Sequence, residues 1–335
     1  MKFIIIGENI HCSRAIKTTN RRLSQSSDGA WRLEYAAGAD THYLPIPPEI
    51  VSGEDWTAGR LRHCALAVHL GVSGTAEHQA SARDYIHTLA RRQTKAGAAY
   101  LDVNVDEFHQ DVEIRYQAMR WLVKTVMVAT DLPLSIDSSH PVVLEAGLQT
   151  CAGRPTLLNS VSLERFETIA MAEKYRAQVI ASAAGPSGIP SAAEERIENL
   201  EKLLSHLAEA GIAQDDIFID PLILPVSTDS TQPGVTLETI RQLREQHGKA
   251  LHITGGFSNV SFGMPARRLV NLVFTDMALQ AGADSGIVDP LHINTTELSR
   301  LDASDQAVRL ARNLLSGEDE FGVEFISAYR DGLLN

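Results

Sequence analysis

After residue 96 the sequence alternates short apolar runs with amphipathic stretches, and this alternation constrains the fold more than any other feature. Seven of the apolar runs read as strands, and an eighth opens the chain as "KFIIIG". The seven are Ala99–Val105, Leu132–Asp137, Thr156–Val161, Ala177–Ser182, Asp216–Asp220, Ala250–Thr254 and Ser285–Asp289. Runs that are apolar throughout indicate strands buried on both faces, and eight strand–helix units predict an α/β fold of the closed (β/α)8, or TIM barrel, type.

The segment Ser191–Ala210 is typical of the expected helices, because its leucines recur at helical spacing and a glycine follows it. An open, doubly wound sheet is the alternative fold. Such a sheet is expected to carry a G-x-G-x-x-G fingerprint after its first strand, whereas this chain reads "IIIGENIHCSR" there. We therefore expect one barrel domain over residues 1–335.

Residues 12–79 interrupt the alternation and are predicted to be an insertion within the barrel. The segment is rich in Gly, Ser, Thr, Pro and His, and it is much longer than the usual few-residue barrel connection. A long irregular insertion after a strand is commonly a lid or a binding loop. A packed surface excursion with only a structural role is the alternative.

Composition excludes several classes of protein. Thirty basic and 42 acidic side chains give a formal charge of -12, which argues against a nucleic-acid partner. No run approaches the roughly 20 apolar residues of a membrane span, and the N-terminus lacks the length and cleavage site of a signal peptide. The three cysteines form no Cys-x-x-Cys pair and the 12 histidines no His-Glu-x-x-His motif, so no metal site is expected. We expect a cytoplasmic protein with no membrane contact.

Polar residues gather at the carboxyl ends of the expected strands, where the active sites of such barrels lie. A carboxylate accepts two adjacent hydrogen bonds, which matches an amino group beside a ring N–H, and an amide both donates and accepts. The set therefore suits the 2-amino-4-oxo-pyrimidine edge of a pterin or a guanine, although an isolated strand-end Asp is also a common helix cap. Its members are Glu8, Asn9, Asp102, Asn104, Asp137, Ser138, Asn159, Ser160, Asp220, Ser258, Asn259 and Ser261.

With these residues in view, the chain resembles the methyltetrahydrofolate:corrinoid methyltransferases of the pterin-binding, dihydropteroate-synthase-like family. The most specific motifs are "DIFIDPLILPVS" and "GGFSNVSFGMPARRLVN", and "GAAYLDVNV", "LPLSIDSSHPVVLEAGL" and "PTLLNSVSLE" precede them in the same order. The resemblance implies tetrahydrofolate or 5-methyltetrahydrofolate as substrate. Its pterin ring would be held by Asp137, Asn159 and Asp220, with Asp102 and Asn104 in support.

The resemblance also implies roles for the last motif. Asn259, as the catalytic residue, would approach the ring nitrogen that bears the methyl group, and Arg267 would lie near the pterin face. Ser258, Ser261, Ser138 and Glu8 complete the predicted substrate-binding set. The sequence departs from the family's pattern at Asp106, at His140 and in the length of the insertion.

The implied reaction moves a methyl group, in either direction, between 5-methyltetrahydrofolate and the cobalt of a corrinoid. This chain carries no Asp-x-His-x-x-Gly motif, so the cobalamin is expected on a partner corrinoid protein. The family further suggests a homodimer.

Two alternatives remain open. Dihydropteroate synthase shares the barrel, but it is expected to carry different loops from the "ENIHCSR" and "DPLHINTTE" that follow the first and last strands. The other alternative is a non-catalytic adaptor that binds folate or the corrinoid protein.

Overall fold

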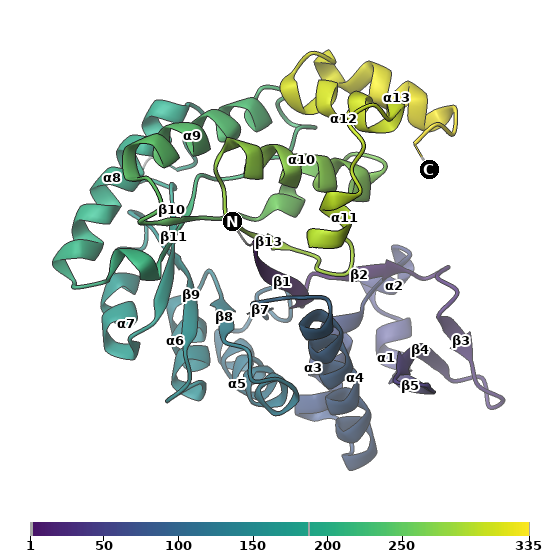
Figure 1. Ribbon diagram of the computed structural model, residues 1–335. Coiled ribbons are helices and arrows are strands. Elements are labelled where there is room, and N and C mark those ends of the chain that lie inside the picture. The colour runs from purple at the N-terminus through teal and green to yellow at the C-terminus, as the bar shows by residue number, and fades with distance from the viewer. Residues whose placement is uncertain (1–2, 187, 335) are drawn as a thin grey trace. The chain divides into compact units, whose positions relative to one another are not determined.

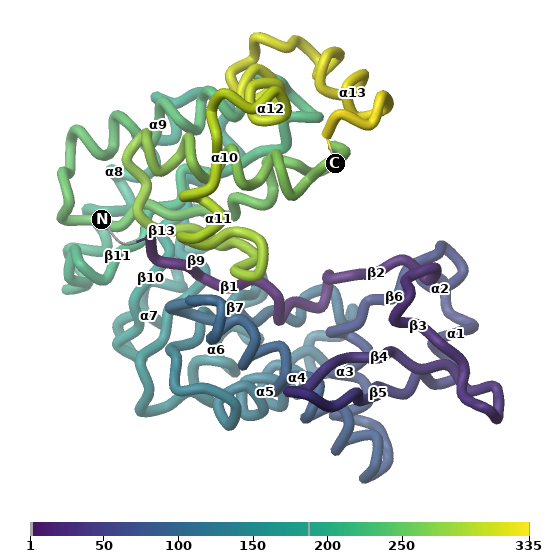
Figure 2. Tube along the Cα trace, turned by 45° about the vertical axis from the view of Figure 1, so that its right-hand side comes forward, coloured from purple at the N-terminus to yellow at the C-terminus, as the bar shows by residue number. Residues whose placement is uncertain are grey.

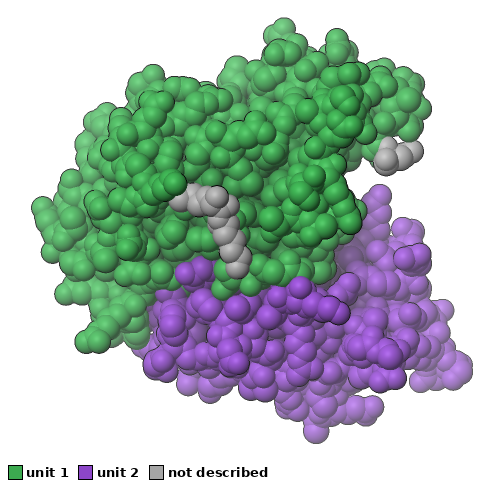
Figure 3. Space-filling model, viewed as in Figure 1, with its two compact units in different colours: residues 1–7, 96–99, 157–335 green, residues 8–95, 100–156 purple. Residues whose placement is uncertain are grey.

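The computed structural model describes residues 3–186 and 188–334 (Figure 1). The chain divides into two compact units, which are coloured separately in Figure 3. The first unit comprises residues 1–7, 96–99 and 157–335, and the second comprises residues 8–95 and 100–156. The expectation of a single domain over the whole chain stays a prediction.

Eight strands form one parallel sheet in the order β12-β11-β10-β9-β8-β7-β1-β13. The Asp284 and Ile287 N–H groups donate to the carbonyls of Ile253 and Gly255 at 3.2 and 2.9 Å, which joins the strands at the two ends of this order. The fold is the (β/α)8 barrel that the alternation predicts, and all eight expected strands are present. Their bounds are β1 Ile4–His11, β7 Tyr100–Asn104, β8 Leu134–Asp137, β9 Thr156–Val161, β10 Gln178–Ser182, β11 Ile217–Asp220, β12 His252–Ile253 and β13 Ser285–Val288.

In the first unit, helices follow the strands β9 to β13 (Figure 1). The helix expected over Ser191–Ala210 is α8, and its buried face includes Arg196 and Asn199 beside the leucines. The helices of this unit are α7 Thr168–Tyr175, α8 Ala193–Glu209, α9 Gln232–His247, α10 Arg267–Ala281, α11 Thr295–Ser299, α12 Gln306–Ser316 and α13 Val323–Arg330. Three short 3₁₀ helices are η1 Gln214–Asp216, η2 Phe257–Ser261 and η3 Glu320–Gly322.

In the second unit, the helices between residue 48 and residue 150 cover β7 and β8 or belong to the insertion. They are α1 Pro48–Val51, α2 Glu54–Thr57, α3 His63–Ser73, α4 Ala76–Lys95, α5 Val112–Ala129 and α6 Pro141–Thr150. None of the helices in the part of the chain that the structure describes is long and apolar enough to cross a membrane.

The insertion is regular structure and not the irregular segment expected from its composition. Two antiparallel sheets fill it, one ordered β3-β4-β5 and the other a β2-β6 pair (Figure 2). Along β4, Leu33 and Tyr35 are buried while Glu34 between them is exposed, as a half-buried strand requires. The Tyr35 hydroxyl donates to the Asp84 carboxylate of α4 at 2.7 Å, which ties the sheet to that helix. The strands are β2 Ala15–Lys17, β3 Leu23–Gln25, β4 Trp31–Ala37, β5 Asp40–Ile46 and β6 Arg60–Arg62.

Candidate functional site

Asp220 ends β11 in the first unit and is one of the residues expected to hold a ring. Its Oδ1 atom accepts a hydrogen bond from the Leu222 N–H at 2.8 Å, and Leu222 takes a φ of +67°, which a non-glycine residue rarely adopts. Burial raises the pKa of the Asp220 carboxyl to about 6, although the Leu222 N–H and the charge of Arg196 act to lower it. The carboxylate is therefore held in one place by a strained turn, and its charge is the costly form.

Arg196 of α8 stabilises the turn that follows Asp220 through hydrogen bonds. Its side chain is fully buried, and its guanidinium donates to the carbonyls of Pro221 and Leu222 at 3.1 and 2.9 Å. Further hydrogen bonds reach the Pro190 carbonyl, the Thr236 hydroxyl and the Gln232 side chain. Burial lowers the pKa of the guanidinium from its usual value, and the nearby Asp220 charge opposes that shift. The arginine fixes the loop that begins at the site carboxylate.

Gly255 and Gly256 follow β12, and each accommodates a candidate site residue. A Cβ atom on Gly255 would lie 3.0 Å from Asp220 Oδ1 and 2.0 Å from Ile223 Cδ1, and the φ of Gly255 is +152°. A Cβ atom on Gly256 would lie 2.8 Å from Asn259 Nδ2. The paired glycines thus let the Asp220 carboxylate and the Asn259 amide approach neighbouring points of one backbone segment.

Asn259 is the one exposed residue of η2, whose other four residues are buried. Its backbone N–H donates to the Gly256 carbonyl at 2.9 Å, which fixes the turn. Within the described residues, its side-chain amide makes no hydrogen bond to the protein. The local fold therefore leaves the Asn259 amide exposed, with no hydrogen bond to the described residues.

Arg267, Ser258 and Ser261 form a small network behind Asn259. The Arg267 guanidinium donates to the Ser261 hydroxyl at 3.0 Å and to the Ser258 carbonyl at 3.1 Å, and it lies over the Phe262 ring at 4.7 Å. The Ser261 hydroxyl in turn donates to the Ser258 carbonyl at 3.2 Å. In this unit the three residues hold η2 in shape, which is a supporting role for the loop that carries Asn259.

Asn159 lies on β9, where the pairing with β10 is irregular. Ile180 of β10 is opposite Asn159 and Ala181 is opposite Val161, so Ser160 is an extra residue in β9. The Ser160 hydroxyl accepts a hydrogen bond from Arg165 at 2.8 Å. A bulge of this kind re-aims the side chains beside it, and such bulges are frequent next to active sites.

The second unit carries the remaining ring-binding candidates on β7 and β8. The register pairs Asp102 with Ser135 and Asn104 with Asp137, so these side chains lie on one face at two successive levels. Asp102 is buried and accepts a hydrogen bond from the Ser135 hydroxyl at 2.6 Å, while Asn104 Oδ1 accepts from the Asp106 N–H at 2.8 Å. The structure brings Asn104 and Asp137 together at the strand ends, with Asp102 one level deeper.

His11, which the sequence analysis does not include among the site residues, lies beside Asp137. Its Nδ1 accepts the Ser13 N–H at 3.1 Å, and its Nε2 lies 3.9 Å from Asp137 Oδ2. Burial, aided by the charge of Arg14, lowers the pKa of His11 to about 4, so the ring is neutral at physiological pH with its proton on Nε2. His11 thus presents an N–H donor next to the Asp137 carboxylate.

Glu8 and Ser138 are already engaged with protein groups. Arg14 forms an ion pair with the Glu8 carboxylate and also donates to the Glu8 carbonyl at 3.2 Å. The Ser138 hydroxyl donates to Asp106 Oδ1 at 2.6 Å. These contacts assign both residues to shaping the loops after β1 and β8, and their contact with a substrate stays a prediction.

Among the described residues, no group of three or more His, Cys, Asp or Glu side chains is arranged to hold a metal ion.

A family model described as "Pterin binding enzyme" matches residues 73–289, which is more than half of the chain. The chain belongs to this family. The match includes the strands β7 to β13, with Asp137, Asn159, Asp220 and Asn259.

Two curated proteins are similar in sequence to this chain. The chain is 29% identical over 253 residues to a methylcorrinoid:tetrahydrofolate methyltransferase of Eubacterium limosum, covering 74% of this chain and 88% of the relative. It is also 34% identical over 224 residues to the methionine synthase of Mycobacterium tuberculosis, covering 62% of this chain but only 18% of that much longer protein.

Solved structures show the same fold. Dihydropteroate synthase from Stenotrophomonas maltophilia has a TM-score of 0.54 at 18% identity, covering 65% of this chain and 86% of that one. The enzyme from Xanthomonas albilineans in complex with 7,8-dihydropteroate has a TM-score of 0.52 at 20% identity, covering 68% and 85%. At such identities the likeness concerns the fold alone.

Proposed function

We propose that this protein is a methyltransferase that moves a methyl group between 5-methyltetrahydrofolate and the cobalt of a corrinoid carried by a partner protein. The observation that carries the proposal is the free amide of Asn259, exposed on an otherwise buried 3₁₀ helix beside the glycines that also face Asp220. The names of the curated relatives, a methylcorrinoid:tetrahydrofolate methyltransferase and methionine synthase, support the same reaction class.

The chemistry explains a neutral amide at this position. A methyl group on a tertiary amine is a poor electrophile because the departing nitrogen is strongly basic. As the carbon–nitrogen bond breaks, the nitrogen gains electron density, and a hydrogen bond from Asn259 Nδ2 strengthens at that moment. The methyl group passes to the reduced cobalt, and the nitrogen ends with a proton taken from solvent. In the reverse direction the nitrogen of tetrahydrofolate loses that proton as it takes the methyl group.

The carboxylates and amides at the strand ends would bind the ring. We infer that Asp220 accepts from the amino group and a ring N–H of the pterin, with Asn159, Asp137, Asn104 and Asp102 supplying further donors and acceptors. The side chains of Ser261 and Arg267 keep η2 in place through the Ser258 carbonyl, and we infer that Arg267 lies near the pterin face.

The test is a methyl-transfer assay in both directions, with 5-methyltetrahydrofolate and cob(I)alamin in one and methylcobalamin and tetrahydrofolate in the other. Asn259→Ala should slow transfer by about 10²- to 10³-fold, as loss of one donor to a developing charge does elsewhere, while folate affinity changes far less. Gln149→Ala, which removes another exposed carboxamide, is the matched control and should transfer at the wild-type rate.

Other results would assign another function. Tight folate binding with no transfer in either direction identifies a binding adaptor. Formation of dihydropteroate from p-aminobenzoate and a pterin diphosphate identifies a dihydropteroate synthase. The homodimer and the cytoplasmic location remain predictions that sedimentation and cell fractionation would check.

A further inference from the structure

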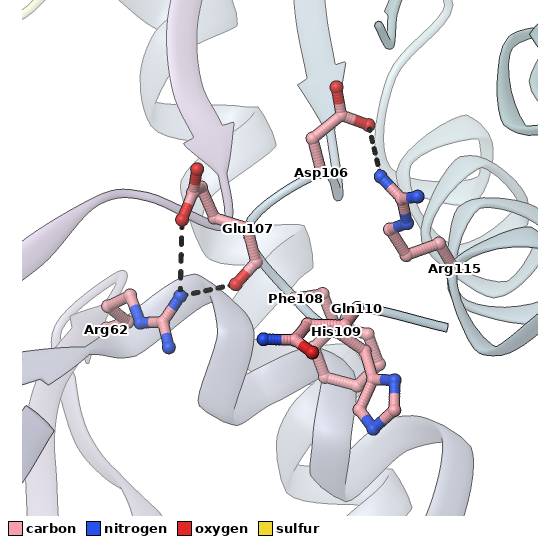
Figure 4. Close-up of a pocket in the computed structure, with 7 residues that line it drawn as sticks. All are labelled: Arg62, Asp106, Glu107, Phe108, His109, Gln110 and Arg115. Carbon is pink, nitrogen blue, oxygen red and sulfur yellow. Dashed lines mark hydrogen bonds and ion pairs between the residues drawn. The ribbon is translucent and has the colours of Figure 1, made fainter. Parts of the chain in front are cut away.

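A cavity of about 630 Å³ lies in the second unit where the loop between β7 and α5 meets the end of β6. The loop residues Asp106 to Gln110 line it, together with Arg62 of β6 and Arg115 in the first turn of α5 (Figure 4). The loop continues directly from the strand end, where the Asp106 N–H donates to Asn104 Oδ1 at 2.8 Å. The cavity is therefore adjacent, within this unit, to side chains assigned above to the pterin ring.

Arg115 is the unusual member of the lining. Its side chain is only 14% exposed, and its buried Nε has no hydrogen-bond partner in the described residues. Its nearest carboxylate oxygen is Asp106 Oδ1, 3.7 Å from Nη1, which is too far for a hydrogen bond. A guanidinium carries five N–H donors, and leaving these donors without acceptors in a partly buried site costs free energy.

The other charged groups of the lining are already engaged. The two Asp106 oxygens accept from the Ser138 hydroxyl at 2.6 Å and the Ser139 N–H at 2.7 Å. Arg62 donates to Asp55 at 2.5 Å and to the Glu107 carbonyl, and it lies 3.8 Å from the Glu107 carboxylate. The lining contains two arginines and two carboxylates. Among these charged side chains, Arg115 is the one whose N–H donors lack hydrogen-bond acceptors in the described residues.

His109 adds a second donor. Its Nδ1 accepts the Asp111 N–H at 2.9 Å, so in the neutral ring the proton is on Nε2. The Phe108 ring lies beside it in the lining and offers an apolar surface (Figure 4). The cavity thus combines an aromatic face with hydrogen-bond donors that suit a planar anion.

We propose that this cavity binds the p-aminobenzoyl-glutamate tail of the folate, with the Arg115 guanidinium donating to a glutamate carboxylate and the Phe108 ring contacting the aminobenzoyl group. The proposal rests on the proposed function, because that function makes a folate the substrate whose ring lies at the ends of β7 and β8. A carboxylate fits better than a phosphate here, because a planar carboxylate matches the guanidinium fork, whereas a phosphate would concentrate about two negative charges on one group beside Glu107 and Asp106.

The test is calorimetric titration of two ligands, 5-methyltetrahydrofolate and 6-methyltetrahydropterin, which lacks the tail. Arg115→Met should weaken binding of the folate by about 10-fold or more, the effect of losing a charge-assisted hydrogen bond, and should leave binding of the tail-less pterin unchanged. Arg120→Met, on the same helix and outside the cavity lining, is the matched control and should change neither affinity. Arg115→Lys, which keeps the charge but loses the planar fork, should restore part of the folate affinity.

The outcomes separate this proposal from the proposed function. Equal losses for both ligands in Arg115→Met, or no loss for either, would overturn the tail subsite while leaving methyl transfer intact. If the wild type binds neither ligand, the proposed function fails and the tail subsite fails with it.

Discussion

Two loops of this barrel each have an arginine of a helix close to a carboxylate, yet the two arginines are placed very differently. Arg196 of α8, which supports the loop after β11, is fully buried and makes five hydrogen bonds with the protein. Arg115 of α5, beside the loop after β7, makes no side-chain hydrogen bond within the described residues and lines a cavity. The first arginine completes the folded structure, whereas the second keeps its donors for a ligand.

The largest expected effect is on stability. Arg196→Met leaves the carbonyls of Pro221 and Leu222 without donors, and it should lower the free energy of unfolding by about 3–5 kcal/mol. Arg115→Met should lower it by less than about 1 kcal/mol, because the guanidinium makes no hydrogen bond within the described residues and its ion pair with Asp106 is long, at 3.7 Å. Urea unfolding followed by circular dichroism measures both. Similar losses for the two variants would remove the distinction between the loops.

A smaller effect is expected from Gly255→Ala. The added methyl group would meet Ile223 Cδ1 at 2.0 Å and Asp220 Oδ1 at 3.0 Å, so we expect a loss of about 1–3 kcal/mol in the free energy of unfolding and weaker folate binding. Gly188→Ala is the matched control, because its φ of +104° is also left-handed but nothing lies within 4 Å of the new Cβ. If the control loses as much as Gly255→Ala, backbone strain explains the effect and close packing against Asp220 does not.

Asp220 predicts a pH dependence for the β11 loop. Its usual pKa of 3.8 is raised to about 6, and the charged group that acts on it in this unit is Arg196, since its β10 partner Ser182 is uncharged. If the carboxylate form binds the pterin, folate affinity should be about tenfold weaker at pH 5 than at pH 7. Titrations at both pH values measure this, and Asp220→Asn should bind weakly with little change between them.

The raised pKa of Asp220 also makes stability depend on pH, and in the opposite sense: the pH range that favours binding lowers the contribution of this residue to stability. The contribution of Asp220 to the free energy of unfolding is fully present below pH 3.8 and is lost as the pH rises through about 6. Asp220→Asn should therefore unfold at a higher temperature than the wild type at pH 8, with the advantage shrinking toward pH 4. A variant that loses both stability and binding at pH 8 would contradict this assignment.

The smallest effect is expected at Asp106. Asp106→Asn removes the charge 3.7 Å from Arg115 and weakens the contacts with Ser138 and Ser139, for a loss of about 1 kcal/mol in the free energy of unfolding. The same change should raise folate affinity about two- to threefold, because the guanidinium then has no competing carboxylate. Weaker folate binding in this variant would mean that Asp106 itself contributes to the ligand site.

The barrel was predictable because its strands are apolar throughout and its helices have a clear period. The sheets of the insertion were not, because β2, β3 and β6 have three residues each and the turns are rich in Gly and Ser, although "WRLEYAA" of β4 shows the period-2 pattern that could have revealed a sheet. Arg196 was missed because charge is normally read as exposed. Its spacing from Leu200, Leu203 and Leu207 places it on the buried face of α8, and that spacing is visible in the sequence.

The strand-end residues were found by their position, but their partners were not. The sequence predicts that Asn104 and Asp137 end neighbouring strands, and the register pairs them. It carries no sign that His11 presents a neutral N–H to Asp137, because that depends on the Ser13 N–H fixing the ring's tautomer. The sequence also does not show which N–H donors of Arg115 lack an acceptor, because the pairing of buried donors depends on the packed structure.

The carbonyl of Gly255 also restricts where the chain can be opened to make a circular permutant. It accepts the Ile287 N–H at 2.9 Å and the Phe257 N–H at 2.9 Å, so one of the two hydrogen bonds that close the sheet and the one that starts η2 share a single acceptor. A circular permutant opened between residues 255 and 256 would cut the backbone at this shared point, weakening the closure of the sheet and the placement of Asn259. A permutant opened in the exposed turn near Leu291 would leave that acceptor intact, which makes it the better starting point for splitting or grafting this enzyme.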